Sequence, residues 1–545
     1  MFARTKKSGK YQYLQIVENK KEAGKVRQQV ISTIGRLDQL QEKGRVETLI
    51  RSLSRFSEST MMIISGKSEI SADAKSIGPV LIFERLWQES GIQDAIRRLL
   101  GKRKFKFDVE RAIFLTVLHR LMVSGSDRFC DKWRRDYLIS GIDELKLHHC
   151  YRAMSFLGEE LSDQSHAMPF SPSRNKDLIE ERMFFANRHL FTELDLVFFD
   201  TTSIYFEGQG GQSLGQRGFS KDHRPDLNQM VVGAVLNEEG RPICCEMWPG
   251  NTADVSTLVP LVERLSHRFR IRKICVVADR GMISHENLKK LEESGISYIL
   301  GVRMRLVKDV AIDVLSRAGR YREVYPESSD RSKPAPLKVK EVNHNGKRYI
   351  VCLNQRQARK DAADRQAIIE SLEKQLKKGA NSLVGNKGYR KYLKIEKNSA
   401  RIDMDKVEAE ERFDGKWVLT TDTDLSAEAV ALKYKQLWQV ERVFRDMKSM
   451  LETRPVYHQN DANIAGHVFC SFLALVLRKE LEQRLANAGH HFEWSDIKQD
   501  LRALKQVEIQ EGGSRFVLRS QCKGHCGKIF QSVKVALPPT IKEAK

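Results

Sequence analysis

Two short apolar runs, each ending in an aspartate, constrain the fold of this chain more than any other feature. Residues 196–199 lead directly into Asp200, and residues 273–278 lead into Asp279. Runs so dense in β-formers are typical of strands buried on both faces of a sheet. A carboxylate at the edge of such a strand is costly to desolvate unless something pairs with it. The two runs predict an α/β fold in which central strands carry acids where they leave the core.

A third acid, Glu441, lies in residues 434–448, whose pattern predicts one long helix. At 100° per residue, one narrow face of that helix carries an acid flanked by aromatic residues and cations, and the other face is apolar. The residues of this polar face are Tyr434, Trp438, Glu441, Arg445 and Lys448. An ordinary surface face with Glu–Arg pairs one turn apart would show the same pattern. Two strand-end aspartates in the same chain favour the interpretation as part of a site.

Three carboxylates that converge from two strands and a helix suit hard divalent cations, because such cations prefer oxygen ligands. We expect Mg²⁺, with Mn²⁺ able to substitute. Two such ions can support an in-line displacement at phosphorus, for which the protein mainly positions charge. Asp200 and Asp279 are 79 residues apart, whereas 162 residues separate Asp279 from Glu441. The longer interval exceeds what one helix and one strand need, and it predicts an inserted domain.

The composition favours a polyanionic partner. The net charge is +22, from 93 basic and 71 acidic residues, and lysine and arginine release counterions from phosphate backbones. A soluble protein that is merely basic is the alternative. Nine cysteines without regular spacing indicate reduced thiols, as in a cytoplasm. The apolar stretch 468–477 is too short to span a bilayer, so we expect no membrane association.

The pattern of predicted helices, strands and charged tracts along the sequence indicates several domains. A helical module near the N-terminus contains the basic tract Lys102, Arg103 and Lys104. Basic charge on such a module suits contacts with DNA phosphates, although a solvated loop fits this tract equally well. The expected divisions are an N-terminal β-hairpin and helix over 1–60, a helical DNA-binding domain over 75–190, an α/β catalytic domain over 191–302 and 416–455, an inserted β-rich domain over 303–415 and a helical C-terminal region over 456–545.

Several motifs resemble those of the bacterial insertion-sequence transposases of the DDE type, in the group with a large β-rich insertion before the catalytic glutamate. The segments F-D-T-T at 199–202 and A-D-R-G-M at 278–282 are similar to that group. Its helix motif, Y-x2-R-x3-E-x6-K, is met at Tyr434, Glu441 and Lys448, but Leu437 stands at the arginine position. Arg445, on the same predicted face as the glutamate, could supply the missing cation.

The resemblance implies a ribonuclease-H-like catalytic core in which Asp200, Asp279 and Glu441 are the catalytic and metal-binding residues, with Mg²⁺ as the cofactor. It implies double-stranded DNA as the substrate, both the terminal inverted repeats and a target, and action as a homodimer. We expect a cytoplasmic, nucleoid-associated bacterial protein. A basic loop over 215–226 follows the first aspartate. The predicted DNA contacts are Tyr434, Arg445, Lys448, Arg280, Lys221, Arg224, Lys102, Arg103 and Lys104.

Other interpretations stay open at this stage. A ribonuclease-H-like nuclease could cleave DNA without joining it, and a basic DNA-binding protein could carry the same carboxylates as structural groups. A chain of this family could also have lost its activity, although all three carboxylates remain at family spacing. Cys522 and Cys526, with His525 between them, hint weakly at zinc, but no second ligand pair has suitable spacing.

Overall fold

The computed structural model describes residues 2–22, 25–42, 45–46, 49, 71–101, 103–186, 195–271, 274–325, 336–377, 390–396, 399–511 and 514–544. Lys102 of the predicted basic tract lies outside these residues. The chain divides into two compact units. The smaller unit comprises 1–75, 505–521 and 538–545, and the larger comprises 76–504 and 522–537.

The smaller unit contains two antiparallel sheets. The first has the order β1-β2-β3, from β1 (Phe2–Ser8), β2 (Tyr11–Glu22) and β3 (Lys25–Arg36), and the short helix α1 (Leu37–Glu42) follows it. The hairpin predicted near the N-terminus corresponds to β2 and β3, whereas β1 is an additional strand. The second sheet has the order β18-β17-β16-β4, from β18 (Ile541–Ala544), β17 (Ser514–Arg519), β16 (Lys505–Glu511) and β4 (Ser71–Ser76).

The three C-terminal strands differ from the helical region expected over 456–545. Their signal is present in the sequence, because Val507 and Ile509 alternate with polar residues and Gly512-Gly513 follows as turn-forming residues. Val507 pairs with Leu518 and Ile509 pairs with Phe516, so the apolar side chains face each other across the two strands.

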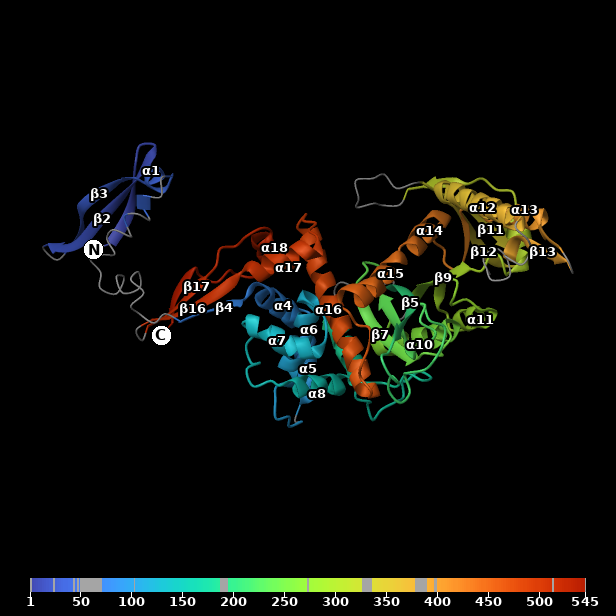
Figure 1. Ribbon diagram of the computed structural model, residues 1–545, viewed down its shortest axis with the longest axis horizontal. Coiled ribbons are helices and arrows are strands. Elements are labelled where there is room, and N and C mark those ends of the chain that lie inside the picture. The colour runs from blue at the N-terminus through green and yellow to red at the C-terminus, as the bar shows by residue number, and fades with distance from the viewer. Residues whose placement is uncertain are drawn as a thin grey trace. The chain divides into compact units, whose positions relative to one another are not determined.

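The larger unit is built on a nine-stranded sheet of order β10-β11-β12-β15-β9-β8-β5-β6-β7 (Figure 1). At its centre β5 (Asp195–Tyr205), β8 (Ile274–Ala278) and β9 (Ser297–Val302) are parallel neighbours. The strands β6 (Gln229–Leu236) and β7 (Pro242–Pro249) add antiparallel pairs beyond β5. All five residues of β8 are buried, as its continuous apolar run predicts for a central strand.

The segment expected as a separate β-rich domain extends this same sheet. The strand β12 (Lys347–Leu353) pairs with β15 (Lys416–Thr421), which pairs in turn with β9. Val342 and Val351 therefore share one core cluster with Val302 and Val418. The segment also carries β10 (Arg322–Val324), β11 (Leu337–His344), the helices α12 (Gln355–Leu376) and α13 (Met404–Glu411), and a ribbon of β13 (Leu393–Glu396) and β14 (Ser399–Ile402).

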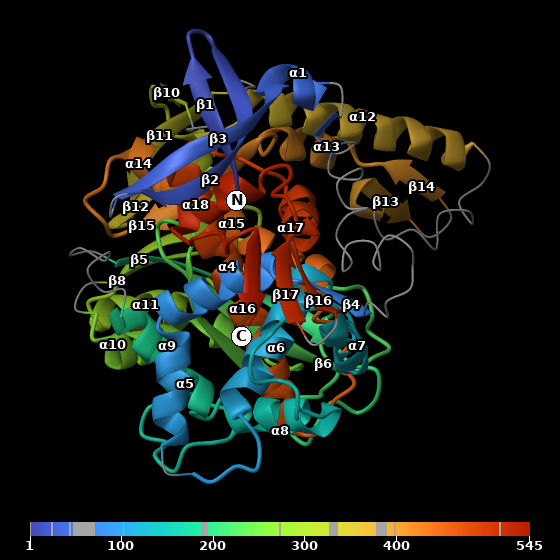
Figure 2. The same ribbon diagram turned by 90° about the vertical axis from the view of Figure 1, so that its left-hand side faces the viewer.

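Helices from both ends of the larger unit form one core. The long C-terminal helix α16 (Asp461–Asn487) packs on α6 (Val109–Met122) and α8 (Leu147–Gly158), which belong to the predicted N-terminal helical module (Figures 1 and 2). A Cβ on Gly466 would lie 1.9 Å from the Met154 carbonyl oxygen, and one on Gly158 would lie 2.0 Å from that of Ala462. The two helices thus touch backbone to backbone. Further helices that contribute to this core include α4 (Gly78–Glu89), α5 (Ile92–Leu100), α7 (Asp127–Trp133), α9 (Asn175–Ala186), α17 (Trp494–Ala503) and α18 (Cys526–Val533).

The predicted single helix over 434–448 is wrong in its continuity. The chain forms α14 (Ala427–Lys435) and α15 (Trp438–Arg445), and a wide π-helical turn (Asp446–Met450) follows. Between the helices, Leu437 N donates to Tyr434 O, and Val440 N donates to Leu437 O, both over 3.0 Å. These tight turns carry Leu437 into the apolar core, where it is 7% exposed. The 100° spacing therefore does not hold from Tyr434 to Lys448.

None of the helices within the described ranges is both long enough and apolar enough to cross a membrane.

Candidate active site

Asp200 and Asp279 leave the sheet side by side. Phe199 of β5 lies opposite Ala278 of β8 in a parallel pair. Asp200 and Asp279 follow these two residues, so both lie at the same edge of the sheet. This edge is where β8 ends while β5 continues alongside β6. The carboxyl ends of parallel strands meet at one edge of a sheet, which is where α/β folds place their sites. The sheet topology thus brings together two of the three predicted catalytic acids.

The environment of Asp200 opposes its ionisation. Burial raises the pKa of its carboxyl group from 3.8 to about 6, and the negative charges of Asp279 and Asp254 add to this effect. Lys221 and a hydrogen bond from Thr201 N, at 2.7 Å from Asp200 Oδ1, act in the opposite direction on this pKa. Like charges close together raise a carboxyl pKa, and a cation among them would lower it. This edge of the sheet therefore has the electrostatics of a cation site.

Asp254 was not among the residues singled out from the sequence. It lies at the start of a short 3₁₀ turn (Asp254–Ser256) before α10 (Leu258–Phe269). Thr201 Oγ1 donates to Asp254 Oδ1 over 2.7 Å, and Lys221 Nζ is 2.9 Å from Asp254 Oδ2. Acids commonly occupy the beginning of a helix because of the helix dipole, so its place in the sequence carries no specific signal. Only the fold places it beside Asp200.

Tyr434, predicted as a DNA contact, lies against Asp279, one of the predicted catalytic acids. Its hydroxyl donates to Asp279 Oδ1 over 3.0 Å. Burial and the neighbouring charge of Asp279 raise the pKa of the Tyr434 hydroxyl, so it remains a donor. Gly301 of β9 makes this approach possible, because a Cβ there would lie 2.4 Å from the tyrosine hydroxyl oxygen.

Glu441 occupies an exposed position on α15, and this helix packs against β5 and β6. Within the described part of the chain, its carboxylate makes no hydrogen bond or ion pair. The carboxylate oxygens of Asp200, Asp279 and Glu441 do not all lie within 4.8 Å of one another. The structure thus brings the two aspartates together and puts the glutamate on a helix that packs against the first aspartate's strand.

The basic loop over 215–226 is fastened on two sides. Lys221 Nζ donates to Thr201 O over 2.7 Å, directly beside Asp200. Asp222 pairs with Lys448 at 2.7 Å and with Arg454 at 2.9 Å. Burial lowers the pKa of Lys448, and its ion pair with Asp222 counteracts this effect. Lys448, predicted to contact DNA phosphate, therefore also ties the loop to the segment after Glu441.

Two arginines, Arg224 of this loop and Arg454, lie close to the ring of Tyr205. The guanidinium of Arg224 pairs with Asp226 at 2.9 Å. Arg224 and Arg454 each place a guanidinium carbon 5.6 Å from the centre of the Tyr205 ring. Cations at this distance from an aromatic ring are attracted by its quadrupole.

The remaining predicted DNA contacts lie on exposed surface. Arg280 follows Asp279 directly, and Arg445 lies on α15 without an ion pair to any residue that the structure describes. Arg103 and Lys104 are also exposed, but they belong to the helical module. Arg103 pairs there with Glu159 at 2.8 Å. The structure does not bring these two residues to the carboxylates by any described contact.

One group of potential metal ligands, Glu180, Cys244 and Glu246, is fully buried but already neutralised. Arg268 donates to Glu180 over 2.8 Å and to Glu246 over 3.1 Å. Further cations complete this buried network between α9, α10 and β7, namely Lys176 and Arg264. Buried acids held by arginines in this way serve the fold rather than a metal.

A second group of potential metal ligands consists of Asp127, His458 and His467, and its side chains also have partners within the protein. His467 Nδ1 lies 2.9 Å from an Arg120 nitrogen, and His467 Nε2 lies 3.1 Å from the Thr453 carbonyl oxygen. Both ring nitrogens of His467 thus have partners. Neither Cys522 nor Cys526 belongs to a group of three potential ligands among the described residues. The structure therefore does not support a zinc site at these two cysteines.

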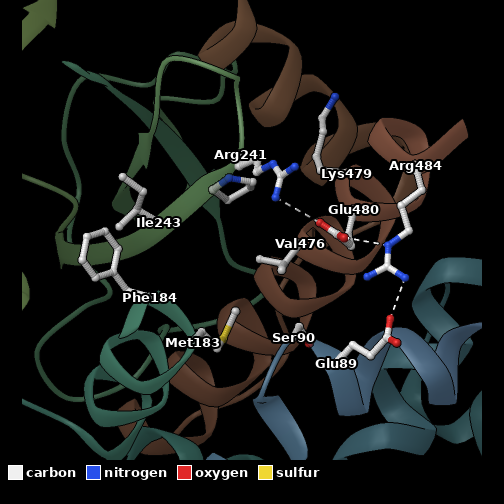
Figure 3. A pocket seen from close by; sticks show the side chains of 11 residues that line it. Glu89, Ser90, Met183, Phe184, Arg241, Ile243, Val476, Lys479, Glu480 and Arg484 are labelled. Atoms are coloured by element: carbon white, nitrogen blue, oxygen red, sulfur yellow. Dashed lines mark hydrogen bonds and ion pairs between the residues drawn. The ribbon is translucent and has the colours of Figure 1, made fainter. Parts of the chain in front are cut away.

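A small cavity of about 80 Å³ lies apart from the carboxylates, between α4, α9, β7 and α16 (Figure 3). Figure 3 shows Glu480 between two arginines: Arg241 at 3.3 Å and Arg484 at 2.8 Å. Arg484 also pairs with Glu89 at 2.6 Å. This chain of ion pairs joins the sheet to the helical core, and the cavity contains none of the predicted site residues.

Comparisons with known proteins point to one family. Residues 192–477, more than half of the chain, match the transposase DDE domain, and residues 2–66 match the N-terminal domain of IS1634 family transposases. Among solved structures, a piggyBac transposase synaptic complex with hairpin DNA is similar over 78% of this chain and 79% of that chain, at 11% identity and a TM-score of 0.35. No curated protein matches the chain.

Proposed function

Because this chain belongs to the IS1634 family of DDE transposases, enzymes that catalyse DNA transposition by phosphoryl transfer, we propose that Asp200, Asp279 and Glu441 are its metal-binding catalytic residues. The DDE domain is ribonuclease-H-like within a mixed α/β fold. One observation carries the proposal. Asp200 and Asp279 follow directly opposed residues of two parallel strands, and the helix that bears Glu441 packs on the first of these strands.

DDE transposases generally use a divalent metal, and we propose Mg²⁺, with Mn²⁺ able to substitute. The donor set fits, since carboxylate oxygens are the ligands that these hard cations prefer. The raised pKa of Asp200, caused by burial and by neighbouring acids, also fits a place where a cation would relieve repulsion. A bound divalent ion would stabilise negative charge that develops on phosphate oxygens during strand cleavage.

The chain's own residues orient these acids. Tyr434 donates to Asp279 and limits the rotation of that carboxylate. Lys221 holds Asp254 and the backbone of Thr201, so a cation stays close to Asp200. In this proposal Asp254 is a positioning residue that keeps Lys221 in place.

The exposed cations around this edge are the proposed contacts to the DNA backbone. Arg280 is adjacent to Asp279, and Arg445 lies one turn beyond Glu441 on α15. We propose that Arg445 takes the role of the arginine missing at Leu437, because a guanidinium can grip phosphate through two parallel hydrogen bonds. The further contacts proposed near the site are Tyr434, Lys448, Lys221 and Arg224.

The substrate in this proposal is double-stranded DNA, first the terminal inverted repeats of the element and then the target. The helical module, through Lys102, Arg103 and Lys104, would contribute to recognition of the element's ends. Two copies of the chain would act together, one for each end. The net charge of +22 supports extensive contact with DNA phosphates.

The test is strand cleavage by Asp200→Asn, Asp279→Asn and Glu441→Gln on a duplex carrying the end of the chain's own element. Each variant should lose cleavage in Mg²⁺ and in Mn²⁺ while binding the same duplex in a gel-shift assay. Asp405→Asn and Glu408→Gln, two exposed acids of α13, serve as matched controls and should cleave normally. Near-wild-type cleavage by any of the three variants would remove that residue from the site.

A further inference from the structure

Phe219 is the most exposed large hydrophobic side chain among the described residues, at 86%. It lies in the loop between β5 and β6, where the polar neighbours Ser220 and Lys221 follow it. A lone exposed hydrophobic residue is common on protein surfaces and needs no explanation. Two further features distinguish Phe219: how its loop is held, and what its loop touches.

The backbone on both sides of Phe219 is fixed. Immediately before it, a Cβ on Gly218 would lie 1.9 Å from the Gly250 carbonyl oxygen, so the chain is pressed against the end of β7. Two residues after it, Lys221 N donates to Ser203 Oγ over 2.8 Å. The backbone is thus held on both sides of Phe219, and the phenyl ring extends into solvent from this fixed position.

The same contacts place Phe219 close to the catalytic edge. The backbone of Lys221 lies at Ser203, three residues along β5 from Asp200, and Lys221 Nζ extends from there to Thr201. Phe219 is two residues of chain, at most about 7 Å, from the Lys221 backbone. DNA whose phosphate lies at Asp200 and Asp279 would therefore present its nearby bases within reach of the phenyl ring.

We propose that Phe219 is a DNA wedge: its ring inserts between bases beside the scissile phosphate and holds the strand in an unstacked form. This inference rests on the proposed function of the same site. Apolar side chains that enter a base step unstack it and kink the duplex, and stacking of a base on an aromatic ring offsets part of that cost. The adjacent Lys221 and Arg224 supply cations for the displaced backbone.

The experiment compares Phe219→Ala with wild type on two duplexes that carry the end of the chain's own element. One duplex is fully paired, and the other has two mismatched base pairs beside the cleavage site. The variant should cleave the paired duplex about tenfold or more slowly, and the mismatched duplex at close to the wild-type rate, because that substrate is already unstacked. Phe219→Trp should retain cleavage of both. Phe170→Ala, a change at another exposed phenylalanine (76% exposed) outside this loop, should leave both rates unchanged.

A second measurement reports on the wedge without cleavage. In the Asp200→Asn background, 2-aminopurine placed beside the scissile phosphate should brighten on binding when Phe219 is present and stay quenched when it is alanine. Wild-type cleavage of paired DNA by Phe219→Ala, or an equal loss on both duplexes with unchanged 2-aminopurine signal, would overturn the wedge. Such results would leave the proposed function standing, because that function depends on the three carboxylate variants.

Discussion

Asp200 shows how strongly the fold changes the chemistry of one residue. Its pKa rises from 3.8 to about 6 through burial and neighbouring acids. Above pH 6 the folded protein must therefore hold an unfavourable charge that the unfolded chain carries without cost. Below pH 3.8 both states are protonated and the cost disappears. The metal-free protein is thus destabilised by Asp200 at neutral pH, and this effect weakens as the pH falls through 6.

Asp200→Asn should accordingly stabilise the metal-free protein. We expect a gain of about 2–3 kcal/mol at pH 8, the free energy that corresponds to moving one pKa from 3.8 to about 6, and roughly half of it at pH 5. Urea unfolding in EDTA at both pH values measures the gain, with Asp405→Asn as the control. A gain independent of pH, or a loss, would contradict the electrostatic description of this edge.

At the scale of elements, the crossing of α8 and α16 decides how the two ends of the larger unit join. Gly466 and Gly158 let the helix backbones touch, as the distances of 1.9 and 2.0 Å for added Cβ atoms show. Since the obstructing atoms are backbone carbonyls, the clash cannot be relieved by rotating a side chain. The helices would have to separate and leave the surrounding core less well packed.

Gly466→Ala and Gly158→Ala should each lower the free energy of unfolding by about 1–3 kcal/mol, despite the better helix propensity of alanine. Gly527→Ala, in α18, is the matched control, because an added Cβ there would meet only Cys522 Sγ, at a distance of 3.9 Å. This variant should have an unchanged or slightly higher free energy of unfolding. Thermal denaturation followed by circular dichroism distinguishes these outcomes. Unchanged stability in both helix-crossing variants would show that the crossing relaxes without cost.

At the scale of the whole molecule, the helical module cannot be removed as a piece. Deleting residues 1–190 would take away α6 and α8 and expose α16, whose Phe469 and Phe472 are fully buried. Recognition of DNA by this module is therefore best tested by point changes on its surface. The net charge of +22 makes any binding to DNA steeply dependent on salt.

The double variant Arg103→Ala/Lys104→Ala should bind the end duplex more weakly. The slope of log affinity against log salt should become shallower by about 0.9 for each DNA phosphate that the variant no longer neutralises. Lys289→Ala/Lys290→Ala, which removes two exposed cations of α11 (His285–Glu293), is the control. Fluorescence anisotropy at salt concentrations from about 50 to 200 mM provides both slopes. Equal slopes for the two double variants would show that Arg103 and Lys104 do not contribute to recognition of the element's ends.

Much of the candidate site was visible in the sequence. An acid that ends a continuous apolar run can be recognised without a structure, because few positions let a charge stand next to a fully buried strand. Asp254 could not be found in this way. It lies 54 residues from Asp200 and carries only the ordinary signal of a helix start, so its place beside Lys221 depends on the packing of the chain. Tyr434 was recognised as part of the motif, but its hydrogen bond to Asp279 depends on the absence of a side chain at Gly301.

The central strands, the position of their acids and the family resemblance could be predicted without a structure, since these depend on local runs of residues. The remaining features depend on contacts between segments that are far apart in the chain. The strands of the predicted insertion join the sheet that carries Asp200 through β12 and β15. The predicted glutamate helix is interrupted between α14 and α15, and Leu437 at that turn is buried in the core. Periodicity along a sequence contains no information about which neighbour a residue will be buried against.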